Sequence, residues 1–457
     1  VADPDLVNEV TNLVEQPTAL MGTFAEEYLD LPDVVLTTVM KKHQRYFAVT
    51  DKKGRLLPVF LAVRNGDKKH LDTVIGGNEH VIRARFADAR YFFNEDLKCS
   101  LAEYLPALKT LTFHENLGSY YDKTVRLEGL TARLGAALGI DEDSMLEHAI
   151  RAARLCKADL ATQLVVEMTS LQGEMGREYA LRSGEPEAVA NAIAEHYRPR
   201  YAGDALPQSP AGIAVALADR LDSLVGLFSV GLQPTGSADP YGLRRAALGI
   251  VQILLEHRIH LNLREALSWA AMDYTRELGR AVISDETLAA VLDFITARLQ
   301  GVLRETYRYD VVEAVIATKA YDPFQAQRYA EQLTAWMARD DWPVTLDAYA
   351  RCARITRGQE RRFTLKPEAF VEPIEQTLYD AYCQAADSLG LDSDVDDFLM
   401  AFLPLVPLIT TFFAPAEEGG VLVMHPDGAI RENRLALLQH IVALAEGIVD
   451  LSQLEGF

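Results

Sequence analysis

The stretch that decides the fold runs from residue 214 to residue 250 and reads AVALADRLDSLVGLFSVGLQPTGSADPYGLRRAALGI. Its first half places apolar side chains at helical spacing, at Val215, Leu217, Leu221, Leu224, Val225 and Phe228. Asp219 and Asp222 interrupt this apolar run. The pattern predicts a helix in which Asp219 lies within a buried segment, and a buried carboxylate needs a partner.

A turn rich in glycine and proline follows this helix. Five residues break the helical pattern, namely Gly231, Pro234, Gly236, Ser237 and Pro240. We expect Asp239 to cap a second helix that has Pro240 at its first position. Arg244 and Arg245 then lie one turn into that helix.

Composition limits the classes of protein that fit. The chain has 457 residues, of which 49% are hydrophobic, so two to four domains with sizeable cores are expected. It starts at Val1 without a signal segment, and we expect a piece of a longer chain. No apolar run reaches the roughly 18 residues of a membrane span, so no membrane partner is expected. The net charge of −21 disfavours non-specific binding to nucleic acid, and no DNA partner is expected.

The four cysteines are scattered and form no Cys-x-x-Cys pair. This spacing argues against a disulfide framework and against a cysteine zinc site. It is typical of a reducing compartment, and we predict a cytoplasmic location.

The order of the elements predicts a mainly α fold with an α+β portion at the N-terminus. Strands are expected at 34–40, 45–50 and 56–63, followed by a helix that opens at 76–79. Later helices are expected at 122–138, 144–160, 185–197, 263–278, 285–303, 323–339, 345–357, 373–389, 395–413 and 431–449. Breaks in the periodicity divide the chain into residues 1–105, 106–255, 256–325 and 326–457.

One constellation has the shape of the metal site in HD-domain phosphohydrolases, in which adjacent His and Asp ligands stand on one helix and an Asp stands on a later one. Here Cys156 and Lys157 fill the His-Asp positions, and Lys123 stands where a first histidine is expected. Asp219 remains, with only Glu195 or His196 to help it. This set lacks the roughly four to six ligands that a divalent cation needs. We therefore expect no metal and predict an ion pair between Lys157 and Asp219; a metal-dependent phosphohydrolase is the alternative.

Two basic clusters lie in the last third of the chain. Residues 351–362 read RCARITRGQERR, and on a helix four of their arginines fall within about 120° of arc. These are Arg351, Arg354, Arg357 and Arg361. The second cluster consists of Arg431, Asn433 and Arg434. Guanidinium groups can hold phosphates and stack on unpaired bases, as RNA loops require. The alternative is that they pair with acidic neighbours of an acidic protein.

A third set of cations lies in the N-terminal portion, at Lys41–Tyr46 and around Arg83, Arg85 and Arg90. These short segments fit either nucleic-acid contacts or ordinary amphipathic edges. The phosphate loop, the dinucleotide fingerprint, the serine elbow and the His-Glu-x-x-His pair are all absent from the sequence. We therefore expect no self-sufficient ATP site and no catalytic residue.

Several long motifs resemble the β subunit of bacterial glycyl-tRNA synthetase. They are HQRYF (43–47), GNEHVIRARFADARYFFNED (77–96), LGSYYDK (117–123), LQGEMG (171–176), EHYRPR (195–200) and PTGSADPYGLRR (234–245). They follow the order of the family and spread over most of the chain. Residues 351–356 and 431–438 also resemble the two marked segments of its C-terminal helical domain.

The resemblance implies more than the residues alone. It implies an α2β2 glycine–tRNA ligase, or a fused chain, that uses ATP and Mg2+ at a catalytic site on the α subunit. The β subunit would bind tRNA(Gly) and no cofactor of its own. Residues 106–255 would form an HD-like domain with a degenerate site, and residues 326–457 an anticodon-binding domain similar to that of arginyl-type synthetases. The arginine cluster then becomes the expected tRNA contact.

Overall fold

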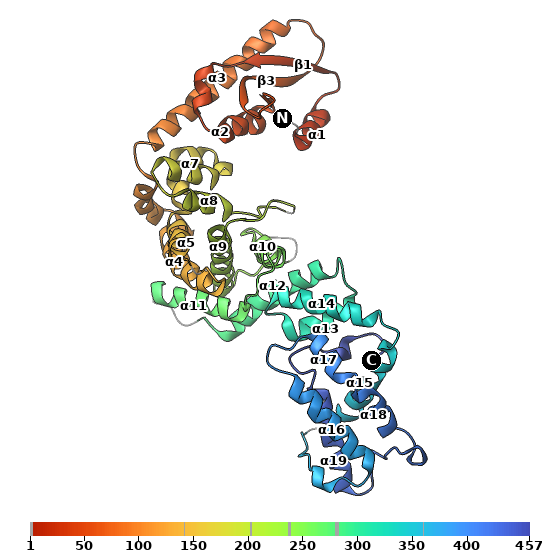
Figure 1. The fold of residues 1–457 in the computed structure, drawn as a ribbon. Coiled ribbons are helices and arrows are strands. Elements are labelled where there is room, and N and C mark those ends of the chain that lie inside the picture. The colour runs from red at the N-terminus through yellow and green to blue at the C-terminus, as the bar shows by residue number, and fades with distance from the viewer. Residues whose placement is uncertain (1–2, 141, 202, 236–238, 279–282, 360) are drawn as a thin grey trace. The chain divides into compact units, whose positions relative to one another are not determined.

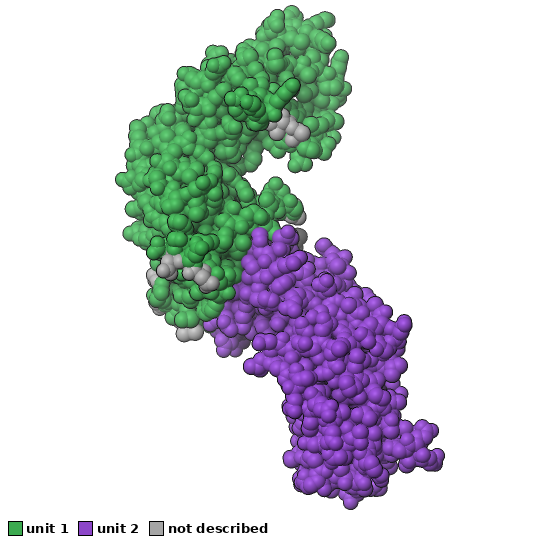
Figure 2. All heavy atoms as spheres, viewed as in Figure 1, with its two compact units in different colours: residues 1–233, 269–283 green, residues 234–268, 284–457 purple. Residues whose placement is uncertain are grey.

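The computed structural model describes residues 3–140, 142–201, 203–235, 239–278, 283–359 and 361–457. Helices dominate, and a small antiparallel sheet lies near the N-terminus (Figure 1), so the predicted fold class is confirmed. The chain divides into two units: residues 1–233 with 269–283, and residues 234–268 with 284–457 (Figure 2). The finer division into four parts stays a prediction.

The N-terminal portion is a three-stranded sheet covered by one long helix. Its elements are α1 (Pro4–Leu13), β1 (Pro17–Thr23), α2 (Asp33–Thr38), β2 (Phe47–Thr50), β3 (Leu56–Asn65) and α3 (Leu71–Asp96). The strand order is β1-β3-β2, with Leu20 opposite Ala62 and Gly22 opposite Phe60. The Phe60 ring passes so close to Gly22 that an added Cβ would lie 2.3 Å from it. Glycine is therefore required at this position.

The predicted strand at 34–40 is wrong. This segment forms α2 and continues as a π-helical turn, Val39–Gln44. Its β-branched residues favour a strand, but Val35, Leu36, Val39 and Met40 are all buried, and this spacing is that of one helix face. The burial of this helix face therefore outweighs the strand propensity of its residues.

The rest of the first unit is helical around α9. It contains α4 (Tyr120–Ala137), α5 (Asp143–Leu155), α6 (Gln163–Glu167), α7 (Glu174–Arg182), α8 (Glu187–Glu195) and α9 (Pro210–Ser229). Helix α9 packs against α4, α5 and α8 and is buried along most of its length, as its sequence predicts. The Ser209 hydroxyl accepts from the Gly212 N–H at 3.0 Å and caps the helix.

Helix α10 (Leu243–Glu256) starts later than predicted. Gly242, with a φ of 66°, stands at its N-cap, and Pro240 lies before the helix. The Asp239 carboxylate still accepts hydrogen bonds from the N–H groups of Leu243 and Arg244, at 2.7 and 2.9 Å. Asp239 therefore caps the helix from a distance. Gly236 and Ser237 of the predicted turn lie outside the described residues.

The second unit is built from helices alone in the part of it that the structure describes. It contains α10, α12 (Asp285–Leu303), α13 (Tyr309–Lys319), α14 (Pro323–Met337), α15 (Trp342–Thr356), α16 (Pro373–Ser388), α17 (Val395–Phe402), α18 (Leu405–Phe412) and α19 (Gly428–Ala443). Helix α11 (Leu263–Leu278) is divided between the two units at Trp269. Helix α15 packs against α18 and α19.

The single helix predicted at 395–413 is two helices. Pro404 has no N–H to donate, so the helical hydrogen-bond pattern is interrupted between α17 and α18, although Leu403 keeps helical backbone angles. Among the residues that the structure describes, no single helix is both long and apolar enough to cross a membrane. Helices α17 and α18, bent by 51°, reach that length and apolarity only as a pair.

Candidate functional site

Four helices of the first unit bring the predicted HD-like residues together. Lys123 stands on α4, Lys157 follows α5, His196 follows α8, and Asp219 stands on α9. Asp222 follows Asp219 by three residues, so the two carboxylates lie on the same face of α9. We call these five residues the lysine–aspartate cluster.

Ion pairs link the members of the cluster. Lys157 Nζ lies 3.0 Å from Asp219 Oδ2, so the predicted pair is confirmed. Lys123 Nζ lies 3.0 Å from Asp219 Oδ1, outside hydrogen-bond geometry, and 2.8 Å from Asp222 Oδ2. Both lysines are almost fully buried. Each ammonium also faces an aromatic ring, that of Phe113 for Lys123 and that of Tyr197 for Lys157.

Arg126 is a further buried cation that the sequence analysis missed. Its Nε donates to Asp222 Oδ1 at 2.7 Å, and its guanidinium stacks on Tyr274 at 4.1 Å. The Tyr274 hydroxyl donates to the Asp222 carbonyl at 2.9 Å. Arg126 follows Lys123 by three residues, so helical spacing alone could have indicated that both share the face toward α9.

The protonation states follow from burial and the two lysines. Burial opposes ionisation of Asp219, but Lys123 and Lys157 outweigh it and hold the pKa of this carboxyl well below its ordinary value. Burial and then Lys157 lower the pKa of His196 well below its ordinary value. The neutral imidazole therefore accepts from Lys157 Nζ at 2.8 Å through Nε2 and donates to the Ile193 carbonyl through Nδ1 at 2.6 Å.

Cys156 and Glu195 are not bound into these ion pairs. The Cys156 thiol is buried and donates to the Ala153 carbonyl, and burial raises its pKa to about 12. Glu195 Oε2 accepts from the N–H and the hydroxyl of Ser209, at 2.9 and 2.7 Å, and so fixes the start of α9. Both residues have structural roles.

The donor set of the cluster does not fit a metal ion. Lys123 Nζ contacts both carboxylates and Lys157 Nζ contacts Asp219 and His196, where a divalent cation would need anionic or neutral ligands. In the described part of the chain, no three His, Cys, Asp or Glu side chains are grouped so that they could hold a metal. The cluster is a charge-paired joint between four helices.

The C-terminal arginines lie in the second unit, on α15 and the segment after it. Arg351, Arg354, Arg357 and Arg361 are all exposed. Arg351 pairs with Asp347 at 2.7 Å, and Arg361 with Glu432 at 2.7 Å. Arg354 and Arg357 form no ion pair with a described carboxylate; each guanidinium instead lies 5.7 Å from the ring centre of Phe457.

The second predicted cluster is not a common surface. The Arg434 guanidinium is buried and pairs with the buried carboxylate of Glu375 at 2.8 Å. Asn433 is buried too, and its amide exchanges hydrogen bonds with the backbone of Lys366. Only Arg431 is partly exposed, and it donates to the His425 carbonyl. Asn433 and Arg434 therefore hold the segment between α15 and α16 in place.

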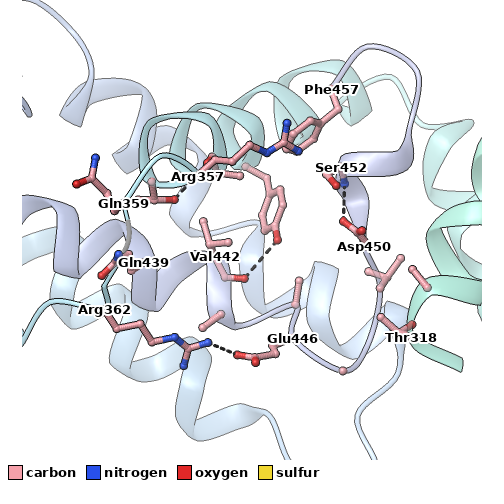
Figure 3. Close-up of a pocket in the computed structure, with 18 of the residues that line it drawn as sticks. Thr318, Arg357, Gln359, Arg362, Gln439, Val442, Glu446, Asp450, Ser452 and Phe457 are labelled. Carbon is pink, nitrogen blue, oxygen red and sulfur yellow. Dashed lines mark hydrogen bonds and ion pairs between the residues drawn. The ribbon is translucent and has the colours of Figure 1, made fainter. Parts of the chain in front are cut away.

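A cavity of about 610 Å³ opens beside the exposed arginines (Figure 3). Helix α15 contributes Tyr349 and Thr356, and α19 contributes Gln439 and Val442. Arg357 and Phe457 stand at one end of it, and Arg362 with Glu446 at another. No sequence pattern pointed to Phe457, because it is far from the arginines along the chain.

Three of the six lysines and arginines of the predicted N-terminal set form ion pairs. Lys41 pairs with Asp3, Arg45 with Glu9, and Arg90 with Glu27. This favours the amphipathic-edge alternative for these three. Arg83 and Arg85 are exposed on α3.

Comparison with known proteins identifies the family. The family model for the glycyl-tRNA synthetase beta subunit matches residues 1–317. The glycine–tRNA ligase beta subunit of Desulforamulus reducens is 41% identical over 457 residues, which are 99% of this chain and 65% of that protein. The beta subunit of Clostridioides difficile is 41% identical over 99% of this chain and 64% of its own length.

A plant relative extends the comparison. The glycine–tRNA ligase, chloroplastic/mitochondrial 2, of Arabidopsis thaliana is 40% identical over 100% of this chain and 42% of its own length. This chain thus spans about 65% of the first bacterial relative and less of the plant one. The chain belongs to the glycyl-tRNA synthetase beta subunit family.

Proposed function

We propose that this chain is the tRNA-recognition part of a glycine–tRNA ligase, which joins glycine to tRNA(Gly). The observation that carries the proposal is the pair Arg354 and Arg357, two exposed guanidiniums that form no ion pair with a described carboxylate, although Asp450 interacts electrostatically with Arg357. In a chain with a net charge of −21, such cations are suited to an anionic partner. Phosphates of RNA match the fork of a guanidinium.

The proposal assigns the chemistry to a partner. A glycyl-tRNA synthetase α subunit, separate in an α2β2 assembly or fused in one chain, would hold the catalytic site with ATP and Mg2+. This chain would bind no cofactor and would work in the cytoplasm. The names of the bacterial relatives, which are beta subunits, and the greater length of the plant relative support this division.

The HD-type phosphohydrolase is the weaker alternative. Its metal would have to share the cluster with Lys123 and Lys157, whose ammonium groups already occupy the space between the helices. Metal-dependent phosphate release that is lost in Asp219→Ala would reverse this ranking.

Two measurements test the proposed function. The purified chain with glycine and ATP should give no ATP–pyrophosphate exchange, and exchange should require the α subunit. Steady exchange by the chain alone would overturn the division of labour.

Binding of tRNA(Gly) tests the arginine surface. Replacing Arg354 and Arg357 together by alanine should weaken binding by about 1–3 kcal/mol, since each loses a phosphate or base contact. The matched control is Arg339→Ala, because Arg339 is an exposed arginine of the same unit that is paired with Asp341. Equal loss in both variants, or none in either, would contradict the assignment.

A further inference from the structure

We propose that the cavity beside Arg357 takes one unstacked nucleobase of a single-stranded RNA segment, with Phe457 as the stacking platform. This inference rests on the proposed RNA binding and adds the chemical class of the ligand and the residues that hold it. All the residues that line this cavity lie in the second unit.

The size and lining of the cavity suit a nucleotide. Its volume of about 610 Å³ lies within the range of roughly 300–1,000 Å³ that is usual for small-ligand sites. The lining combines an aromatic ring, small side chains such as Ala353 and Ala443, and polar groups at Thr356, Gln359 and Ser452. A flat apolar base with polar edges needs this combination.

Phe457 is placed to stack. Tyr349 lies on one side of it, at 6.3 Å between ring centres, and its ring is only partly buried. Arg354 and Arg357 each lie 5.7 Å from the centre of the ring, so two positive charges are close to it; Figure 3 shows Arg357 beside Phe457. A base can stack on the aromatic ring while the neighbouring cations neutralise the phosphates of its nucleotide. Because every base can stack on an aromatic ring, this interaction does not select a sequence.

The opposite wall is rigid. The Gln439 amide accepts from the Phe363 N–H at 2.9 Å and donates to the Arg361 carbonyl at 3.0 Å. The exposed Arg362–Glu446 ion pair, at 2.7 Å, lies at the rim (Figure 3). Because Gln439 uses both ends of its amide on the backbone, it shapes the cavity and does not read base edges. A preformed wall lowers the ordering cost of binding.

Base-paired RNA would not use this cavity. In an A-form duplex the base faces are stacked, and a protein meets mainly phosphates and 2′-hydroxyls. The ring of Phe457 can therefore stack only on a base that is neither paired nor stacked on its neighbours.

The test uses the full chain and a seven-nucleotide single-stranded RNA carrying 2-aminopurine at its centre, whose fluorescence is quenched by stacking. Phe457→Tyr should keep both the quenching and the affinity. Phe457→Leu keeps an apolar side chain but has no aromatic face, and it should lose the quenching and about ten-fold or more in affinity. The same RNA fully paired with its complementary strand should bind both variants equally.

The outcomes separate this inference from the proposed function. If Arg354 and Arg357 variants weaken tRNA binding but Phe457→Leu behaves as wild type, the cavity is not a base site and the RNA surface stands. If Phe457→Tyr also fails, with a lowered melting temperature in both variants, Phe457 acts only through folding and the inference is overturned. If the wild-type chain binds no RNA, both proposals fall.

Discussion

Asp219 lies between two lysine ammoniums, and its charge is what allows both to be buried. Among the described residues, Lys157 Nζ forms no ion pair with a second carboxylate; its other contacts are His196 and the ring of Tyr197. Lys123 retains Asp222, which Arg126 also uses. Without Asp219 the two lysines of the cluster and Arg126 would face one carboxylate, that of Asp222, and an unbalanced buried charge is costly.

We therefore expect Asp219→Asn to lower the free energy of unfolding by about 3 kcal/mol. Urea denaturation followed by circular dichroism measures this. Asp347→Asn is the matched control, because it removes the partner of Arg351 in an exposed pair, and it should change stability by less than about 1 kcal/mol. A loss at Asp219 no greater than that of the control would mean that water enters the cluster.

Asp159 is a second buried carboxyl, and its environment favours the protonated form. Its Oδ2 accepts from the N–H groups of Gly173 and Gly176, but its Oδ1 has no hydrogen-bond partner. Burial raises its pKa from 3.8 to about 6, although the backbone N–H groups act in the opposite direction.

This raised pKa gives the stability a definite pH dependence. Between pH 3.8 and about 6 the folded state keeps a proton that the unfolded chain releases, so the contribution of Asp159 falls as pH rises through this window. Asparagine keeps an acceptor for both N–H groups and never ionises. The unfolding free energy of wild type minus that of Asp159→Asn should fall by about 1.4 kcal/mol per pH unit there and level off above it. A constant difference would contradict the raised pKa.

At the scale of the element, α9 depends on close approach to its neighbours. A Cβ at Gly226 would lie 2.0 Å from Tyr274 Oη, which is itself held by the Asp222 carbonyl. Glycine costs helix stability, so its presence here has a packing reason.

Gly226→Ala should therefore destabilise the chain by about 2 kcal/mol, since the forced overpacking outweighs the gain in helix propensity. The control is Gly301→Ala on α12, where nothing lies within 4 Å of the added Cβ. That variant should raise the unfolding free energy by roughly 1 kcal/mol. In thermal denaturation the melting temperatures of the two variants should shift in opposite directions. Shifts in the same direction would mean that the contact with Tyr274 does not determine the effect of Gly226→Ala.

Periodicity predicted many of the helices but missed α1, α7 and α13, although each of them has a buried face. The bounds of α11 and α12 match the predicted ranges, and α15 and α16 differ by a few residues at most. The failures have physical causes. At α2 the β-branched residues were read as a strand, although the buried face is helical, and β1 was missed because Pro17 and Gly22 mask its alternation. Local pattern does not contain the packing that decides such cases.

At the scale of the whole chain, the sequence could predict which charges must pair but not which surfaces form. The Lys157–Asp219 pair followed from two charges in apolar segments. In the sequence, Arg434 could not be distinguished from the exposed arginines of α15. It is nevertheless buried and pairs with Glu375, a partner that is distant along the chain. Phe457 joins Arg354 and Arg357 only through the folding of the last helices, and no spacing rule links them.

The net charge of −21 repels RNA, whereas the exposed arginines of the second unit attract it. The salt dependence of binding separates these two contributions. Each phosphate contact contributes about 0.7 to the slope of log K against log salt for a single strand. Arg357→Ala should therefore reduce the slope by about 0.7, whereas Arg339→Ala should not change it. Phe457→Leu carries no charge change, so it should lower affinity at every salt concentration with an unchanged slope. Equilibrium binding of the seven-nucleotide RNA at roughly 50 to 200 mM salt checks this. An unaltered slope in Arg357→Ala would mean that this guanidinium meets no phosphate, and the cations on α3, Arg83 and Arg85, would become the surface to test.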